Sequence, residues 1–291
     1  MEKDSTGILI ILGIIAIALF GGVKNTNNGP IFGDQNTTRE LSTNQKIADT
    51  QRQIEDLKAK LQIEEDKKTH SQYKDIISLS QVSRSTDPSR EYITIKVDKK
   101  AVGAIPVTGW TLKSLSTGIQ VSIPKAAYLF FTGMINVEED ILLTGGDVMY
   151  LVTGIPPNGT SFKVNKCSGY LGQFQTFIPY LRNNCPKPRD EDLSGIPNTA
   201  INSDCLDYIE SMSQCRIPTK SLPVNWGFEC TNFIYEKINY PSCVNIHKND
   251  SDFYQKEWRV YLKRSESIWK SKREIIILYD NLGMIVDTIK Y

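Results

Sequence analysis

The chain has 291 residues, with 34 Lys and Arg against 33 Asp and Glu, so its formal net charge is only +1. This length is sufficient for one or two domains with hydrophobic cores. The near-neutral charge excludes a strong overall electrostatic field for attracting nucleic acid or an acidic substrate.

The N-terminus combines a short tail, residues 1–6, with an uncharged apolar run, residues 7–23. A run of this length is at the short end of what spans a bilayer. The tail carries Glu2, Lys3 and Asp4, and so lacks the positive charge typical of a cleaved signal peptide. We therefore expect a single-pass signal anchor at residues 7–23. A cleaved signal peptide, with a weak cleavage site at residues 16–18, is the alternative.

Residues 24–38 are polar and contain Gly and Pro, which predicts a flexible linker. Residues 39–84 are expected to form a stalk helix, about 60 Å long over its first 40 residues. Ile47, Ile54 and Leu61 recur every seven residues, and Leu57 fills one intermediate position. Residues 41–77 therefore predict either a short coiled coil that forms a homo-oligomer or a solvated helix that acts as a spacer.

After Pro88, which ends the helical pattern, short strands alternate with turns. Ile93, Ile95 and Val97 share one face of the first strand. Further strands are expected at residues 107–113, 119–123, 128–131, 141–143 and 148–152. Many short strands with regular turns indicate an antiparallel sandwich or barrel.

All six cysteines lie between Cys167 and Cys243. An even, clustered set predicts disulfides formed in an oxidising compartment, which would place the C-terminal part outside the cytoplasm. Reduced core cysteines and a zinc site are the alternatives. Zinc is disfavoured because the closest cysteines, Cys205 and Cys215, are not a Cys-x2-Cys pair.

Residues 155–274 are expected to form a Cys-rich helical insert. Helical periodicity occurs over residues 200–214, 229–239 and about 252–273. Beyond the insert, residues 275–279 and 284–291 predict a closing β-hairpin with its turn at residues 280–283.

Six cysteines allow 15 pairings. If residues 201–214 are helical, Cys205 and Cys215 lie about 15 Å apart, which is too far for a disulfide. Two antiparallel helices favour nested bridges instead, and the Cys-x9-Cys spacing also resembles that of twin Cys-x9-Cys hairpins. We therefore expect Cys205–Cys243, Cys215–Cys230 and Cys167–Cys185.

The expected helix at 252–273 carries an excess of cations interleaved with aromatic residues. Lys263, Arg264, Lys270 and Lys272 form a candidate face for an anionic polymer such as a cell-wall glycopolymer or DNA. The alternative is an amphipathic helix whose aromatic residues pack and whose cations are solvated. No nucleophile elbow, His-Glu-x-x-His or Walker loop occurs, so we assign no catalytic, cofactor-binding or metal-binding residue. His247 is interpreted as a surface histidine.

Four groups of residues match the sequence pattern of a known domain family. They are Thr108–Leu112 with Trp110, Ile123-Pro124, the turn at Leu143–Asp147, and the closing segment Leu278–Asp287 with Tyr291. Together they resemble the lamin-tail domain family over residues 91–154 and 275–291. The resemblance implies that residues 91–291 form an immunoglobulin-like β-sandwich, mainly β with an α insert, in which Trp110 fills the core. It also implies a binding or adaptor role. Bacterial relatives of the family are often secreted or attached to the membrane. The insert of about 120 residues departs from the family pattern.

These observations predict a membrane-anchored, extracytoplasmic binding, adaptor or structural module at the bacterial cell surface, without enzymatic activity or cofactor. The alternative is a peptidoglycan hydrolase whose carboxylate pair is brought together only by folding.

Overall fold

The computed structural model describes residues 36–291, and their side chains for residues 46–65 and 68–291. The predicted signal anchor at residues 7–23 and most of the predicted linker lie outside the described residues. No helix of the described residues is long and apolar enough to cross a membrane. The chain divides into two compact units, residues 1–61 and 62–291, which are described separately.

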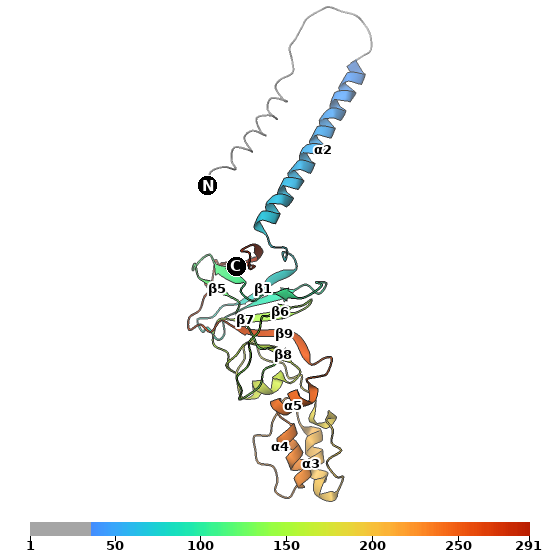
Figure 1. The fold of residues 1–291 in the computed structure, drawn as a ribbon, viewed down its shortest axis with the longest axis vertical. Coiled ribbons are helices and arrows are strands. Elements are labelled where there is room, and N and C mark those ends of the chain that lie inside the picture. Colours follow the sequence, from blue (N-terminus) through green and yellow to red (C-terminus); the bar gives the residue numbers. More distant parts are fainter. Residues whose placement is uncertain (1–35) are drawn as a thin grey trace, which may run out of the picture. The chain divides into compact units, whose positions relative to one another are not determined.

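Helix α2 spans Asn36–Thr69 (Figure 1). The prediction of a long helix here is confirmed, but both of its boundaries are wrong. Residues 36–38, expected in the linker, belong to the helix, and residues 77–83 form strand β1 instead of continuing it. Strand β1 forms because Ile77 and Leu79 are buried in the core, whereas none of the helix side chains that the structure describes is buried.

A five-stranded sheet has the order β1-β2-β7-β9-β8. Its only parallel pair is β7 with β9, and the other neighbours are antiparallel. The chain therefore leaves the sheet after β7, contributes β8, and returns much later with β9. The strands are β1 (Ile77–Ser83), β2 (Tyr92–Val97), β7 (Val148–Val152), β8 (Phe162–Asn165) and β9 (Tyr254–Tyr261).

A four-stranded antiparallel sheet has the order β11-β10-β4-β5, and a small third sheet pairs β3 with β6. The predicted closing hairpin is confirmed as β10 and β11. The strand expected at residues 128–131 is absent, and Ala127 forms an isolated bridge with Phe162 instead. The described chain is therefore a mixed α/β structure with several sheets. The strands are β3 (Ile105–Pro106), β4 (Thr111–Ser114), β5 (Gln120–Ser122), β6 (Leu142–Leu143), β10 (Ile275–Tyr279) and β11 (Ile285–Lys290).

Two hydrophobic cores hold this unit together. The first lies between the two larger sheets and contains Trp110, whose ring centroid is 5.2 Å from that of Tyr73. The second joins the five-stranded sheet to the insert through residues such as Phe162 and Phe177. The sheet that carries β9 therefore contributes side chains to both cores.

The helix expected at residues 252–273 is wrong, because residues 254–261 form strand β9. Trp258 and Val260 lie in the first core, whereas Tyr261 lies in the second. A strand buried on both faces need not alternate between apolar and polar residues, so its sequence lacks the usual strand signature. Because β8 and β9 belong to the sheet, the insert proper is shorter than the predicted range of 155–274.

The insert contains α3 (Ala200–Ser211), α4 (Phe228–Lys237) and α5 (Tyr240–His247), with 3-10 turns at Ser168–Gln173 and Pro188–Asp190. Figure 1 shows the three helices grouped together, beyond β8 and β9. The helices expected at 200–214 and 229–239 are confirmed. Helix α5 was not expected, and it begins where the Asn239 side chain accepts a hydrogen bond from the Ser242 N–H at 2.9 Å.

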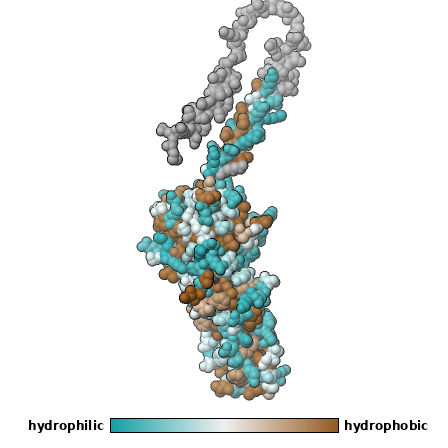
Figure 2. Space-filling model, viewed as in Figure 1, coloured by the Kyte–Doolittle hydropathy of each residue, from teal (hydrophilic) through white to brown (hydrophobic). Residues whose placement is uncertain are grey.

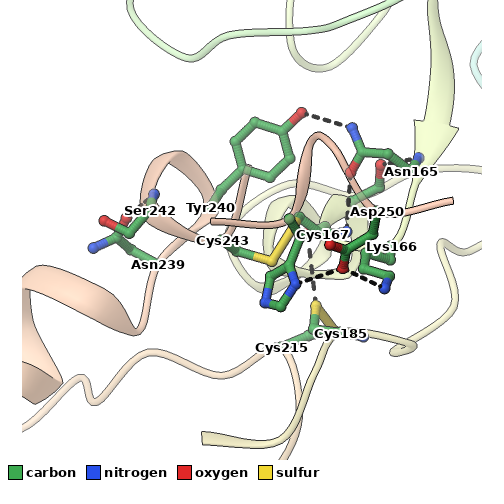
Figure 3. The surroundings of a disulfide bond; sticks show 12 residues. Asn165, Lys166, Cys167, Cys185, Cys215, Asn239, Tyr240, Ser242, Cys243 and Asp250 are labelled. Carbon is green, nitrogen blue, oxygen red and sulfur yellow. Dashed lines mark hydrogen bonds and ion pairs between the residues drawn. A yellow bond between two sulfur atoms is a disulfide. The ribbon is translucent and has the colours of Figure 1, made fainter. Parts of the chain in front are cut away.

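The prediction that all six cysteines form disulfides is confirmed, but every predicted pairing is wrong. The bonds are Cys167–Cys243, Cys185–Cys215 and Cys205–Cys230. Helix α5 carries Cys243 back toward the start of the insert, where it meets Cys167 (Figure 3). Cys215 lies beyond the end of α3, in a turn with φ +57°, and there it bonds to Cys185. Cys205 of α3 bonds to Cys230 of α4.

Residues 262–274 follow an irregular path because two buried carboxylates capture their backbone N–H groups. Glu91 accepts hydrogen bonds from the N–H groups of Ile268 and Trp269, at 2.7 and 3.1 Å. Glu274 accepts one from the Lys270 N–H at 3.1 Å. N–H groups held in this way do not bond to the carbonyls of a preceding helical turn, so the expected helix does not form.

Candidate functional site

A cleft of about 340 Å³ opens where the five-stranded sheet meets the insert. It is lined by the turn before β2 (residues 87–90), the segment after β7 (155–157), the insert segment 176–180, and Tyr261 of β9. Small-molecule sites in proteins have volumes of about 300–1,000 Å³ and favour such junctions between parts of a fold. We therefore take this cleft as the candidate site.

The wall formed by residues 87–90 packs tightly against the end of β7. A Cβ atom at Gly154 would lie only 2.8 Å from the Cα and N atoms of Ser89, so the two backbones approach as closely as glycine alone permits. The Gly154 N–H also donates to the Pro88 carbonyl at 2.9 Å. The close backbone contact and this hydrogen bond therefore fix the wall in place.

The opposite wall is tied to β9 by Arg259, whose side chain is buried. Its guanidinium donates to the carbonyls of Pro179 and Tyr180, pairs with Glu257 at 2.7 Å, and lies 4.6 Å from the ring centroid of Tyr150. The carboxylate compensates the buried charge, and the two carbonyls fix the insert segment. Both walls of the cleft are therefore preorganised.

The rim of the cleft carries polar groups that are not engaged elsewhere. Asp87 accepts hydrogen bonds from the Ser89 side chain and backbone through Oδ1, at 2.7 and 2.9 Å. These bonds lower the pKa of Asp87, so it is a carboxylate at neutral pH. Within the described residues, its Oδ2 and the side chains of Arg90 and Thr176 make no hydrogen bond or ion pair. The cleft therefore presents an acceptor and two donors to a ligand.

Two tyrosines give the cleft its aromatic character. Tyr180 is 75% exposed, so its ring is available for contact. Tyr261 is only 2% exposed, and its hydroxyl has no hydrogen-bond partner among the described residues. Burial raises the pKa of Tyr261, which keeps the hydroxyl protonated. A buried hydroxyl without a partner is uncommon in proteins, and this one belongs to a residue that lines the cleft.

The structure does not place Lys263, Arg264, Lys270 and Lys272 on one helix face, as the sequence predicted. Lys263 occupies a turn with φ +55°, and its Nζ lies 3.5 Å from Glu138. Arg264 is half-buried, and its backbone N–H bonds to the Thr153 carbonyl. Of these four residues, Lys270 and Lys272 are the two that lie together on one short loop as exposed cations.

These two lysines belong to a cationic surface that the sequence did not reveal. Arg84 donates to the Ser271 carbonyl at 2.7 Å and lies 4.9 Å from the ring centroid of Tyr291. Arg84, Lys270, Lys272 and Arg273 are exposed, and none forms an ion pair within the described part of the chain. We call Arg84 together with residues 270–273 the basic loop. Arg84 was missed because it lies far from this loop in sequence.

Another surface feature is apolar. Figure 2 shows hydrophobic residues at the far end of the insert. Ile201 near the start of α3, Phe228 at the start of α4, and Val224 before it are exposed. The Gly227 N–H bonds to the Ile201 carbonyl at 3.3 Å, which brings the two segments together. This surface offers contact area but few groups that select a small ligand, so the cleft is the stronger candidate.

The zinc alternative is wrong because all six cysteines are in disulfides. His247 is also not a plain surface residue, since its side chain is 17% exposed and bonds to Glu191 at 3.0 Å and Asp250 at 2.8 Å. Asp250 in turn pairs with Lys166, which follows β8 (Figure 3). This network fastens the end of α5 to neighbouring segments and lies outside the cleft.

Comparison with protein-family models, with curated proteins and with solved structures finds no match for this chain. The cleft was not predicted, because its lining comes from four segments that are separate in the sequence. In the sequence, Asp87 stands out only as the residue before Pro88, which ends the helical pattern. Residues 176–180 lie in a stretch rich in Pro, Asn and Gly that carries no local motif.

Proposed function

We propose that this chain is a membrane-anchored, extracytoplasmic binding module whose cleft takes a hydroxyl-rich ligand such as a saccharide. The cleft itself carries the proposal. Sugar hydroxyls both donate and accept hydrogen bonds, which matches the free carboxylate oxygen of Asp87 and the donors of Arg90 and Thr176. The exposed ring of Tyr180 offers an apolar face for the C–H surface of a sugar.

The extracytoplasmic location is supported by the three disulfides, because such bonds persist in oxidising compartments. The apolar run at residues 7–23 would supply the anchor. Protease added to intact cells should then digest residues 62–291, while the full-length chain stays with the membrane fraction. Recovery of a mature N-terminus near Leu19 would mean that the segment is a cleaved signal peptide.

We also propose that the strand-rich part is a lamin-tail-like β-sandwich. Two features support this. Trp110 is buried in the core between the two larger sheets, and the closing hairpin joins the sheet through β10, which pairs with β4. A binding or adaptor role is what the resemblance to this family implies.

Binding is favoured over hydrolysis of peptidoglycan. Asp87 is the one carboxylate that lines the cleft within the described residues. Most glycosidases place two carboxylates on either side of the scissile bond, one acting as acid and the other as base or nucleophile. The cleft therefore has the groups to hold a sugar but not the pair that would cleave it.

The experiment is a glycan array probed with the full-length chain in detergent. We expect a subset of glycans to bind, and Tyr180→Ala to weaken that binding about tenfold through loss of the aromatic contact. The matched control is Phe228→Ala, since Phe228 is also 75% exposed but lies at the far end of the insert. If no glycan binds, or if both variants lose binding equally, the proposal is wrong.

A further inference from the structure

The cleft and the basic loop are connected by a single segment, residues 84–90. Arg84 belongs to the basic loop, whereas Asp87 to Arg90 line the cleft. Six residues of extended chain span at most about 22 Å, so one polymer can reach both places. The two surfaces are therefore candidates for a single continuous binding site.

The connecting segment runs alongside residues 267–271 through several contacts. The Ser267 hydroxyl donates to the Ser85 carbonyl at 2.7 Å, Arg84 donates to the Ser271 carbonyl at 2.7 Å, and the Ile268 N–H donates to Glu91 at 2.7 Å. These bonds hold the two segments side by side. The surface between the cleft and the basic loop is consequently fixed, which reduces the entropy lost when a ligand binds.

From this arrangement we propose that the ligand is an anionic polysaccharide, with one sugar unit in the cleft and charged neighbouring units along the basic loop. The inference rests on the proposed function, because it assumes that the cleft holds a sugar. It adds the charge of the ligand and the direction in which the ligand extends.

The negative charge of the ligand follows from the cations of the basic loop. Arg84, Lys270, Lys272 and Arg273 are exposed and have no ion-pair partner within the described residues. Glu274 lies at the base of this loop, but it is buried, and it accepts hydrogen bonds from Ser114 and from backbone N–H groups. Clustered cations of this kind raise the local concentration of anionic ligands.

The carboxylate of Asp87 favours a polysaccharide over a nucleic acid. A nucleic acid carries a phosphate at every unit, and a phosphate in the cleft would meet Arg90 but would also face this carboxylate, whose pKa is lowered by its bonds from Ser89. A sugar unit, including an acidic one such as galacturonate, also has ring hydroxyls away from its acidic group, and these can donate to the free oxygen Oδ2. The cleft therefore selects the hydroxyl-bearing edge of a sugar, while the basic loop selects the acidic groups.

The test compares three polymers on the full-length chain in detergent: polygalacturonate, neutral dextran and duplex DNA. We expect polygalacturonate to bind at least about tenfold more tightly than dextran at low salt. This preference should shrink as salt rises from about 0.01 M to about 0.15 M, because the Debye length falls from about 30 to about 8 Å.

Two matched triple variants localise the effect. Lys270→Gln, Lys272→Gln and Arg273→Gln together should weaken polygalacturonate binding about tenfold. The control changes Lys96, Lys99 and Lys100 to Gln, which removes the same charge from exposed positions on and after β2. It should leave binding unchanged, and both variants should unfold at the wild-type temperature.

Each of the other possible outcomes contradicts a specific part of the proposal. If dextran binds as tightly as polygalacturonate and Tyr180→Ala weakens both, the charge inference fails but the saccharide cleft stands. If duplex DNA binds more tightly than polygalacturonate, and its affinity is unchanged by Tyr180→Ala, the partner is nucleic acid and the inference fails. An equal loss in the control triple variant means that only net charge matters. If neither saccharide binds although other glycans bind on the array, this inference fails and the saccharide cleft stands; if no glycan binds on the array either, the proposed function fails as well.

Discussion

Glu91 fixes the path of the chain beside the cleft. It is fully buried, and its carboxylate accepts hydrogen bonds from the Thr153 hydroxyl and from the N–H groups of Ile268 and Trp269. Glu91→Gln keeps the shape but replaces an acceptor oxygen by an NH2 group, so donors are left unpaired in the core. We expect the free energy of unfolding to fall by about 2–4 kcal/mol, as measured by urea denaturation.

The control for this measurement is Glu266→Gln, because Glu266 is exposed on the same segment. Surface changes of this kind usually alter stability by less than about 0.5 kcal/mol. Equal effects of the two substitutions would show that Glu91 does not hold residues 268–269 in place.

His247 predicts a pH dependence of stability. Burial alone would lower its pKa, but the hydrogen bonds to Glu191 and Asp250 outweigh burial, so the pKa of His247 is raised above its usual value of about 6.5. The protonated form is therefore favoured in the folded state. Its contribution to stability is complete below about pH 6.5 and is lost as the pH rises through the higher folded pKa.

The comparison is between wild type and His247→Gln, with the melting temperature followed from about pH 6 to about pH 9. Hydrogen bonding to Lys166 lowers the pKa of Asp250, so Asp250 stays ionised throughout this window. We expect the wild type to lose stability with rising pH more steeply than the variant. Parallel pH curves would contradict the assignment of this network.

At the scale of secondary structure, local patterns were sufficient where the apolar residues keep the period of the element. Ile93, Ile95 and the closing hairpin follow a two-residue period, and α3 and α4 follow a helical one. The prediction failed for strand β9, because this strand is buried on both faces and does not alternate between apolar and polar residues. The three- and four-residue spacing of Tyr254, Trp258 and Tyr261 is instead typical of a helix.

The disulfide pairing failed for a different reason. It assumed a two-helix hairpin, but a third helix starts at Tyr240, within three residues of Cys243. The pairing then depends on how three helices and the start of the insert pack together, which is not a local property. The cleft is non-local in the same sense, since its walls are brought together by the packing of the insert on the sheet.

Helix α2 is compatible both with a coiled coil that forms an oligomer and with a solvated spacer, and experiment can distinguish the two. Ile47, Leu57 and Leu61 are more than half exposed in the single chain. The predicted oligomer seam at residues 41–77 must be shortened, because the helix ends at Thr69. Self-association along the remaining seam would bury these side chains, and we expect it to stabilise an oligomer.

Cross-linking of the full-length chain, followed by mass determination, tests this expectation. Ile54→Lys with Leu57→Lys places charges in the seam and should leave only monomer. Ala59→Lys with Gln62→Lys adds the same charge at outer positions of the helix and should leave the oligomer intact. A wild-type chain that is monomeric under these conditions would favour the solvated spacer instead.

For the whole molecule, the central relationship is between the sheet and the insert. The parallel pairing of β7 with β9 requires a long crossover, and this crossover carries the insert. Arg259 of β9 then fixes insert residues 179–180 on one side of the cleft, while Gly154 after β7 fixes residues 88–89 on the other. Although the net charge of the chain is close to zero, the fold brings Arg84 and residues 270–273 together in a locally cationic surface, the basic loop.

Hydrogen-exchange mass spectrometry of the full-length chain, with and without polygalacturonate, tests the location of binding most directly. Backbone amides exchange more slowly where a ligand stabilises the local structure. We predict slower exchange in residues 84–91, 153–157 and 175–180, with a smaller effect in residues 267–273. Protection confined to the insert tip around residues 224–228, or no protection at any segment, would contradict the assignment of the cleft as the binding site.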